Sequence, residues 1–180
     1  MILKSKELKL EGVKLFKIKK YTDSRGHFKE TYLSNSKLNE FNINYVQENE
    51  STSKKNVFRG MHFQKGRYSQ SKLLRVICGS ILDVIFDLRE KSPSFNKKLT
   101  IKLLPDEILF IPKGLAHGFL SLENNTIINY KCDQYYKPGH DFGFNPFKSN
   151  LNINWPIDTK DIILSNKDKN FPSLKELKIN

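Results

Sequence analysis

Short runs of alternating hydrophobic and polar residues recur along the chain, and turn-forming residues separate them. Residues 81–88 show the pattern most clearly. One face carries Leu82, Val84, Phe86 and Leu88, whereas the other carries Asp83, Ile85 and Asp87. A two-residue period is that of a β-strand, because successive side chains point to opposite faces of a sheet.

Adjacent runs of this kind predict two β-hairpins. Residues 73–78 and 81–88 flank Gly79-Ser80, and residues 118–122 and 126–130 flank a Glu-Asn-Asn turn. Residues 99–103 and 108–111 predict further strands, whereas helical signal is confined to residues 36–41 and 171–177. Short strands with turns at roughly 8–12-residue spacing predict an all-β sandwich or barrel, with a jelly roll among the candidates. We expect one domain over residues 1–180.

Hydropathy and cysteine content place the chain among cytoplasmic proteins. It has no apolar run near the ~20 residues of a membrane span, and its first residues lack the apolar stretch of a secretory signal. The two cysteines are Cys78 and Cys132. Cys78 lies in an apolar run, so we expect a buried reduced thiol rather than a disulfide.

The formal net charge of +12 raises the question of nucleic-acid binding. The lysines are scattered from end to end, however, and many asparagines accompany them. Such a diffuse distribution indicates compositional bias rather than a binding stripe, so we expect no nucleic-acid partner. An anionic small substrate that carries a diphosphate fits the charge equally well.

His62 is the first candidate for chemistry. Gly60 precedes it closely and permits near approach of a ligand to the backbone, while Arg59 and Lys72 supply cations that suit phosphates. An imidazole also accepts protons near neutral pH. Residues 59 and 62 face opposite ways on a regular strand, so shared ligand contact requires a bulge or the end of the strand. Alternatively, the two residues serve neighbouring regions of the site or different subunits.

A metal site is a poorer interpretation of the same residues. A metal-binding cupin strand would carry histidines at i and i+2 and then a glutamate, but position 64 is Gln and no glutamate follows closely. His62 and His117 alone would make a weak ligand set. We therefore expect no metal.

Several segments together resemble the dTDP-4-dehydrorhamnose 3,5-epimerase family over nearly the whole chain. Each motif alone is weak, and their order and spacing carry the resemblance. They are Asp23-Ser24-Arg25-Gly26-His27-Phe28-Lys29-Glu30, Phe58-Arg59-Gly60-Met61-His62-Phe63-Gln64, Lys72-Leu73, Asp87-Leu88-Arg89, Ser92-Pro93-Ser94-Phe95, Ile111-Pro112-Lys113-Gly114-Leu115-Ala116-His117-Gly118-Phe119, Tyr130-Lys131-Cys132, Tyr135-Tyr136, Trp155-Pro156 and Leu164-Ser165-Asn166-Lys167-Asp168.

The resemblance implies a cupin-like jelly roll, a homodimer, no metal and no organic cofactor. It also implies inversion of the sugar carbons beside a C4 ketone, in a pathway toward rhamnose-type polysaccharide. His62 would remove the proton, and Asp168 would orient the imidazole. Lys72 would offset charge on the C4 oxygen, and Tyr130 would return a proton from the opposite face.

The binding roles come from the resemblance in the same way. Arg25, Arg59 and Lys167 match positions around the nucleotide diphosphate. Gln47 and Asn49 match a segment that lines the site, Glu30 and Asp141 match acidic positions near the nucleotide, Phe28 and Tyr136 match aromatic walls, and His117 matches a histidine that faces the sugar. Taken singly, Asp168 could instead be a helix cap, and Phe28 a core residue.

Two departures from the family pattern leave the sugar and the nucleotide open. An expected Asp-Pro is missing at residues 144–147, and residues 66–69 replace a proline-containing loop with one that holds Arg67 and Tyr68. The alternatives are an epimerase of one centre only, an enzyme for another nucleotide such as GDP, and a non-catalytic sugar-nucleotide-binding cupin. A metal-dependent cupin ranks behind these.

Overall fold

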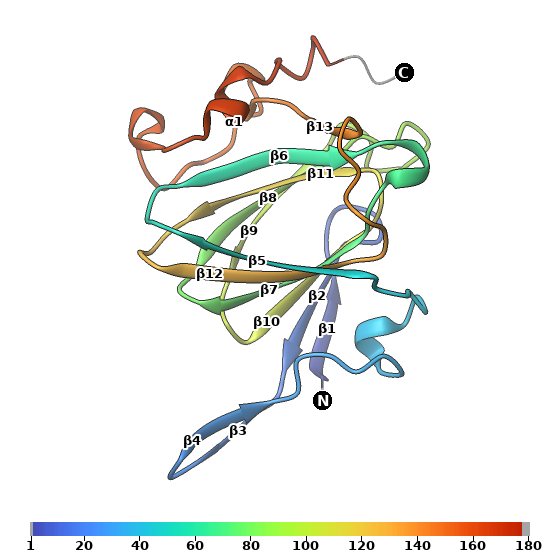
Figure 1. The fold of residues 1–180 in the computed structure, drawn as a ribbon, viewed down its shortest axis with the longest axis vertical. Coiled ribbons are helices and arrows are strands. Elements are labelled where there is room, and N and C mark those ends of the chain that lie inside the picture. The colour runs from blue at the N-terminus through green and yellow to red at the C-terminus, as the bar shows by residue number, and fades with distance from the viewer. Residues whose placement is uncertain (1, 178–180) are drawn as a thin grey trace.

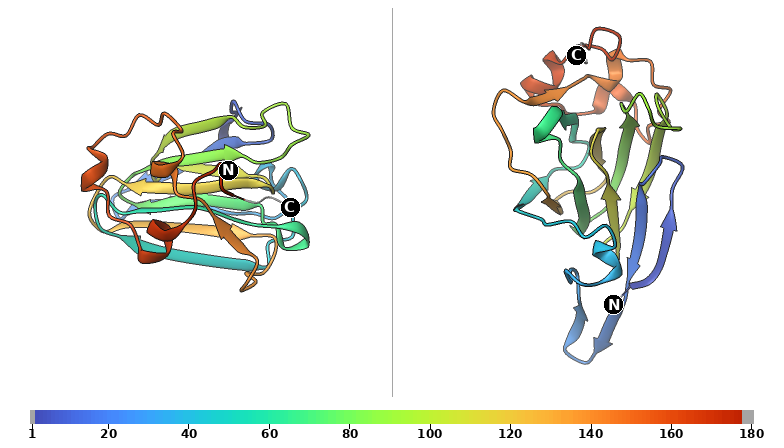
Figure 2. Two further views of the ribbon diagram at one scale, coloured as in Figure 1. Left: turned by 90° about the horizontal axis from the view of Figure 1, so that it is seen from above. Right: turned by 90° about the vertical axis from the view of Figure 1, so that its right-hand side faces the viewer.

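Two antiparallel sheets face each other in the computed structural model, which describes residues 2–177 (Figures 1 and 2). The first sheet has the order β1 (Ile2–Glu7), β2 (Lys14–Ile18), β10 (Glu107–Ile111), β7 (Lys72–Cys78), β12 (Thr126–Cys132) and β5 (Gln47–Ser53). The second has the order β13 (Asp141–Gly143), β6 (Phe58–Gln64), β11 (Leu115–Ser121), β8 (Ile81–Asp87) and β9 (Lys98–Leu103). This confirms the all-β, cupin-like jelly-roll prediction.

A separate two-stranded ribbon projects from one end of this sandwich. It consists of β3 (Lys20–Asp23) and β4 (Gly26–Lys29), which pair only with each other. Figure 1 shows the ribbon standing away from both sheets.

Both predicted hairpins are wrong in their pairing, although their strands are right. β7 pairs with β10 and β12, whereas β8 pairs with β9 and β11. β11 and β12 likewise belong to opposite sheets. The short turns therefore carry the chain from one sheet to the other. At Gly79 φ is +77°, and a Cβ there would lie 2.5 Å from Oγ1 of Thr126, so the corner requires a glycine.

Helical structure is sparse, as predicted, but one of its positions is wrong. The 3₁₀ turn η1 (Lys37–Asn39) lies within the predicted residues 36–41, and Ser36 caps it. Residues 171–177 form no helix; the α-helix α1 (Asn166–Asn170) lies before them and begins after the cap Ser165. The remaining 3₁₀ turns described are η2 (Gly66–Tyr68), η3 (Pro146–Lys148) and η4 (Thr159–Asp161).

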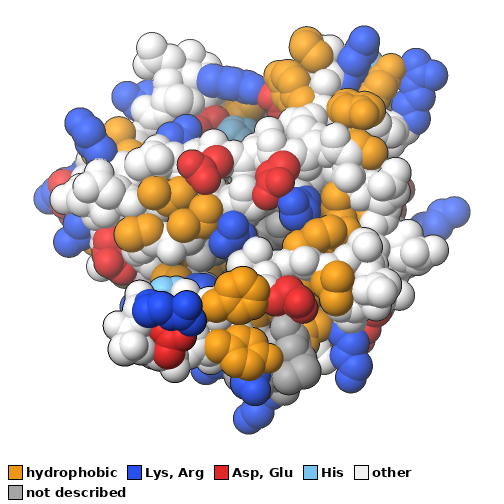
Figure 3. All heavy atoms as spheres, turned by 60° about the horizontal axis from the view of Figure 1, so that its bottom comes forward, with side chains coloured by type: hydrophobic (Ala, Val, Ile, Leu, Met, Phe, Trp, Pro, Cys, Tyr) orange, Lys and Arg blue, Asp and Glu red, His pale blue; other side chains and the backbone are white. Residues whose placement is uncertain are grey.

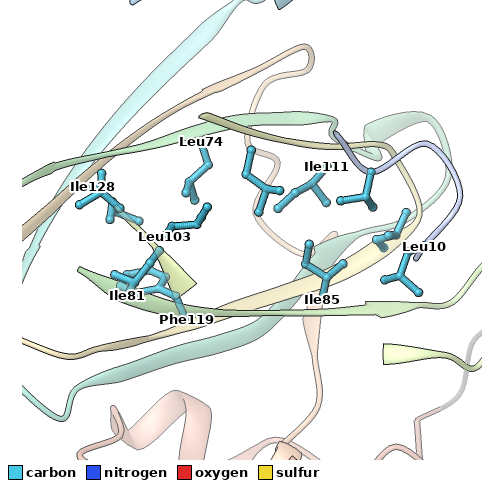
Figure 4. Close-up of a cluster of buried hydrophobic side chains, with 12 residues drawn as sticks. Leu10, Leu74, Ile81, Ile85, Leu103, Ile111, Phe119 and Ile128 are labelled. Atoms are coloured by element: carbon cyan, nitrogen blue, oxygen red, sulfur yellow. The ribbon is translucent and has the colours of Figure 1, made fainter. Parts of the chain in front are cut away.

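Both faces of β8 are buried, so its alternating pattern does not mark an exposed face. Ile81 and Ile85 point into the core between the sheets, together with Leu74, Leu103 and Phe119 (Figure 4). The opposite face packs against the C-terminal segment in a second cluster that includes Val84, Phe86, Phe58, Phe144 and Trp155. The C-terminal segment is thereby fixed against the second sheet, where it can contribute to a site.

The cysteine prediction is corrected in part. Both thiols are free, but Cys78 is exposed at the end of β7, and Cys132 is the buried one. Among residues 2–177, no helix has the length and apolar character needed to span a bilayer.

Candidate active site

Two adjoining cavities of about 480 and 300 Å³ open between the sheets. His62, Lys72 and Tyr130 line both of them. His62 comes from β6 of the second sheet, whereas Lys72 and Tyr130 come from β7 and β12 of the first. The site is therefore bounded by one sheet on each side.

The structure gathers most of the residues predicted for the site around these cavities. The larger cavity is lined by Arg59, His62, Lys72, His117, Tyr130, Lys167 and Asp168, and the smaller adds Gln47, Asn49, Tyr136 and Asp141.

His62 and Asp168 form a hydrogen-bonded pair. Nε2 of His62 lies 2.7 Å from Oδ1 of Asp168, and the carboxylate side chain is only 4% exposed. Burial alone would raise the pKa of Asp168, but hydrogen bonds from His62 and Ser165 outweigh it and hold the pKa below its usual value. An ionised carboxylate at Nε2 orients the ring and leaves Nδ1 as the nitrogen that can accept a proton.

Asp168 is held by the cap that begins α1. Oγ of Ser165 accepts a hydrogen bond from the backbone N–H of Asp168 at 3.1 Å, in the manner of a helix N-cap. The Ser-x-x-Asp sequence is thus a capping motif in which serine is the cap. The aspartate side chain is free to reach His62.

A bulge in β6 brings Arg59 and His62 into the same cavity. His62 lies opposite His117 and Arg59 lies opposite Phe119, so three residue steps on β6 match two on β11. This is the irregularity that shared ligand contact requires. Gly60 makes it possible, because a Cβ there would lie 2.5 Å from Cα of Gly118.

Lys72 and Tyr130 present a cation and a phenol to the cavities. Nζ of Lys72 lies 5.9 Å from the centre of the Tyr130 ring. Burial lowers the pKa of the Lys72 ammonium and raises the pKa of Tyr130. The phenol therefore keeps its proton at neutral pH, as a proton donor must.

The smaller cavity has a wall of mutually bonded side chains. Nε2 of Gln47 donates to Oδ1 of Asn49 at 2.9 Å, and Oε1 of Gln47 accepts from the backbone N–H of Tyr136 at 2.7 Å. Lys167 and Asp141 form an ion pair beside them, and this bond raises the pKa of Lys167. Amides, an aromatic ring and an ion pair suit a polar ligand with a planar group.

Sequence reasoning missed two polar residues of the site, Asp83 and Ser51. Oδ2 of Asp83 lies 2.7 Å from Nε2 of His117, and both side chains are buried. Ser51 lines the larger cavity, and its Oγ is buried without a hydrogen-bond partner in the part of the chain that is described. A charged residue within the apolar run 81–88 was the available signal for Asp83.

Arg25, Phe28 and Glu30 lie away from the cavities of their own chain. Arg25 and Phe28 belong to the projecting ribbon, where the Arg25 side chain is 87% exposed and pairs with Asp23. Phe28 is 67% exposed, so it is not a core residue. Their assignment to a ligand stays a prediction.

Gln64 has a structural role at the position where a metal cupin would carry a histidine. Its Nε2 donates to the backbone oxygens of Tyr68 and Tyr135, and its Oε1 accepts from the N–H of Lys137. Within residues 2–177, no three histidine, cysteine, aspartate or glutamate side chains gather as a metal-binding group. The absence of a metal remains a prediction.

A His–Asp pair that faces a phenol and a lysine across a cavity defines an acid–base enzyme of jelly-roll fold. The family model of dTDP-4-dehydrorhamnose 3,5-epimerase matches residues 7–176, and the chain belongs to this family. The resemblance of the motifs is thereby confirmed, and the family consists of isomerases that act on carbohydrates.

Individual relatives agree with this membership. The chain is 40% identical to dTDP-4-dehydrorhamnose 3,5-epimerase of Methanothermobacter thermautotrophicus, over 93% of this chain and 92% of the relative. A Bacillus anthracis epimerase structure with TDP and PPi bound is 38% identical, with a TM-score of 0.87 over 95% of this chain and 100% of that one. A Legionella pneumophila 3,5-epimerase structure in complex with dTDP-4-keto-L-rhamnose is 32% identical, with a TM-score of 0.89 over 97% and 94%.

Proposed function

We propose that this chain converts dTDP-4-dehydro-6-deoxyglucose into dTDP-4-dehydrorhamnose by inversion at C3 and C5. One observation carries the proposal. The His62–Asp168 pair from the second sheet and Tyr130 from the first line the same cavities, so a base and an acid stand on opposite sides of one space. The family of the chain and the dTDP-containing ligands of the relatives support the choice of substrate.

The proposed step begins with proton removal beside the C4 ketone. Nδ1 of His62 takes the proton from the sugar carbon, and the electron pair of the C–H bond moves to the C4 oxygen as an enolate. Asp168 stabilises the resulting imidazolium. The Lys72 ammonium offsets the negative charge on the C4 oxygen.

The step ends with proton return to the opposite face. The enolate collapses to the ketone as the carbon takes the phenolic proton of Tyr130 from the side away from His62. This inverts the centre. Solvent then removes the extra proton from His62 and reprotonates the phenolate, and the same groups serve the second centre.

Labelling in deuterium oxide tests this function. Purified protein is incubated with the dTDP-linked and the GDP-linked 4-keto-6-deoxy sugars, and deuterium is located by NMR. We expect label at both C3 and C5 of an inverted dTDP-sugar. Label at one carbon would indicate a monoepimerase. Faster labelling of the GDP-sugar would indicate that the substrate carries GDP rather than dTDP. No label with either sugar would indicate a non-catalytic binding protein.

We further propose a homodimer in which the ribbon of β3 and β4 completes the cavity of a second copy. The resemblance gives Arg25 and Phe28 to the ligand, whereas their own chain holds them outside its cavities. Tyr21 and Phe28 are also large exposed hydrophobic residues on a ribbon that pairs with no other strand described. Such side chains gain stability by burial in a second subunit.

A further inference from the structure

A second buried His–Asp pair lies deeper in the site than the first. His117 is 6% exposed and Asp83 is fully buried, and the two side chains lie on neighbouring strands, β11 and β8. Nε2 of His117 lies 2.7 Å from Oδ2 of Asp83. His117 also lines the larger cavity and pairs across the bulge with His62.

Burial of the Asp83 carboxylate costs folding free energy. The carboxylate interrupts a strand face whose neighbouring side chains, Ile81 and Ile85, belong to the core between the sheets. Its second oxygen, Oδ1, is buried with no hydrogen-bond partner among the residues described. A buried carboxylate with half of its hydrogen bonds unmade destabilises the fold unless nearby charges compensate it.

Two side chains face this carboxylate. Nε2 of His117 contacts it directly, and Lys72, from the opposite sheet, interacts with it electrostatically. The other titratable side chains that line this cavity are His62 and Asp168, which bond to each other, and Arg59, Tyr130 and Lys167. Asp83 therefore interacts with two residues that line the cavity, His117 and Lys72.

We propose that Asp83 is a positioning residue that acts through His117. With its Nε2 proton held by Asp83, the imidazole turns Nδ1 into the cavity, and no hydrogen bond from Nδ1 is found among residues 2–177. Nδ1 is then placed to accept a hydrogen bond from a hydroxyl group of the sugar. This inference rests on the proposed function, because it names what the inner end of that same cavity recognises.

Ligand affinities separate this role from a structural one. We expect Asp83→Asn to weaken binding of dTDP-glucose, a probe that cannot be deprotonated beside a ketone, by about tenfold or more, while the affinity for dTDP alone stays unchanged. Calorimetry measures both. Asp168→Asn is the matched control: it also removes the carboxylate of a His–Asp pair, but we expect it to slow proton exchange without loss of dTDP-glucose affinity.

A double-mutant cycle tests whether Asp83 acts through His117. In a His117→Asn background, we expect Asp83→Asn to have no further effect on dTDP-glucose affinity or on kcat/KM. Additive losses in the cycle, equal loss of dTDP affinity, or unchanged affinity for dTDP-glucose in Asp83→Asn would each overturn the proposal.

A spectroscopic measurement on the unaltered protein covers the case in which the Asp83 variant fails to fold. With ¹⁵N-labelled histidine, we expect His117 to carry a proton on Nε2 and its Nδ1 signal to shift when dTDP-glucose binds but not when dTDP binds. The chain has four histidines, and the missing signal in His117→Asn identifies the right one. An Nδ1 that is insensitive to the sugar would contradict the proposal, whereas failure of the deuterium labelling would contradict only the enzymatic function.

Discussion

Two histidines of the site have the same kind of partner but different surroundings. The His62 side chain is 32% exposed, whereas the His117 side chain is 7% exposed. Each has its Nε2 within hydrogen-bond distance of a carboxylate, so Nδ1 is the ring nitrogen left for a ligand. A base must exchange its proton with solvent between turnovers, so the more exposed ring suits that task and the more enclosed ring suits binding.

Substitution of His62 and Tyr130 should separate proton removal from proton return. We expect His62→Ala to lose exchange of substrate hydrogen with solvent deuterium by a factor of at least about 10² while dTDP binding persists, because the base is gone. We expect Tyr130→Phe to retain exchange but to form little inverted product, because only the donor on the far face is gone. Mass spectrometry and NMR of one reaction report both quantities.

The matched control is Tyr135→Phe, which removes a phenol of the same size from a side chain that is 63% exposed. It should leave exchange and inversion unchanged. Full exchange in His62→Ala would refute the base, and wild-type yield of inverted product in Tyr130→Phe would refute the acid.

Individual site residues were predictable where a motif gave them a position. Lys72 follows His62 within one polar segment, whereas Tyr130 is far from both in sequence, and only the family spacing predicted that it would meet them. Asp83 lay outside every motif, and its charge within an apolar strand pattern was the one signal for it. Its partner, His117, is 34 residues away in the chain.

At the level of elements, strands were more predictable than their partners. The two-residue period identified β7, β8, β11 and β12, since burial of alternate side chains is a local property of the sequence. Pairing depends instead on which sheet the following strand joins. A short turn such as Gly79-Ser80 can close a hairpin or cross between two sheets, and the local pattern is the same for both.

The bulge of β6 was predictable from chemistry rather than from pattern. If Arg59 and His62 share a ligand, the strand must be bulged or end there, because a regular strand separates them. The structure achieves this with two glycines that lie back to back. A Cβ on Gly60 would lie 2.5 Å from Cα of Gly118, and a Cβ on Gly118 would lie 2.8 Å from the backbone oxygen of Arg59.

An alanine at Gly60 should therefore damage both stability and catalysis. We expect Gly60→Ala to lower the free energy of unfolding by roughly 1–3 kcal/mol beyond the cost of its backbone strain, because β6 must move from β11. The movement displaces His62, so kcat should fall as well. Urea denaturation and steady-state kinetics measure the two effects.

Gly139→Ala is the control for the strain. Gly139 also has a positive φ, +83° against +137° at Gly60, but a Cβ there would meet nothing within 4 Å. We expect Gly139→Ala to lower the free energy of unfolding by about 1 kcal/mol and to leave kcat unchanged. Equal losses in the two variants would show that the close approach of β6 to β11 does not contribute to the loss of stability in Gly60→Ala.

For the whole molecule, the projecting ribbon is the feature behind the proposed homodimer. The face from which the ribbon projects carries hydrophobic side chains among basic ones (Figure 3). Phe28 and Tyr21 on the ribbon lie 6.5 Å apart between ring centres, and Arg25 at its tip is exposed. A cation beside aromatic rings suits a nucleotide diphosphate, although the cavities of the same chain do not include these residues.

Subunit complementation tests whether the ribbon serves the second copy. We expect Arg25→Ala to lose most activity, because a charged partner of the diphosphate is removed, and His62→Ala to be inactive. If the ribbon of one subunit completes the cavity of the other, a mixed dimer contains one cavity with both native groups. Refolding the two variants together in equal amounts should restore about a quarter of wild-type activity, since half of the dimers are mixed and one of their two sites is complete. If each ribbon served its own cavity, or if the chain were monomeric, no site in the mixture would be complete and activity would stay at the level of the separate variants.

The control is a mixture of His62→Ala with Tyr130→Phe. Both residues line the same cavity of one chain, from opposite sheets, so a mixed dimer still lacks a complete site, and activity should not return.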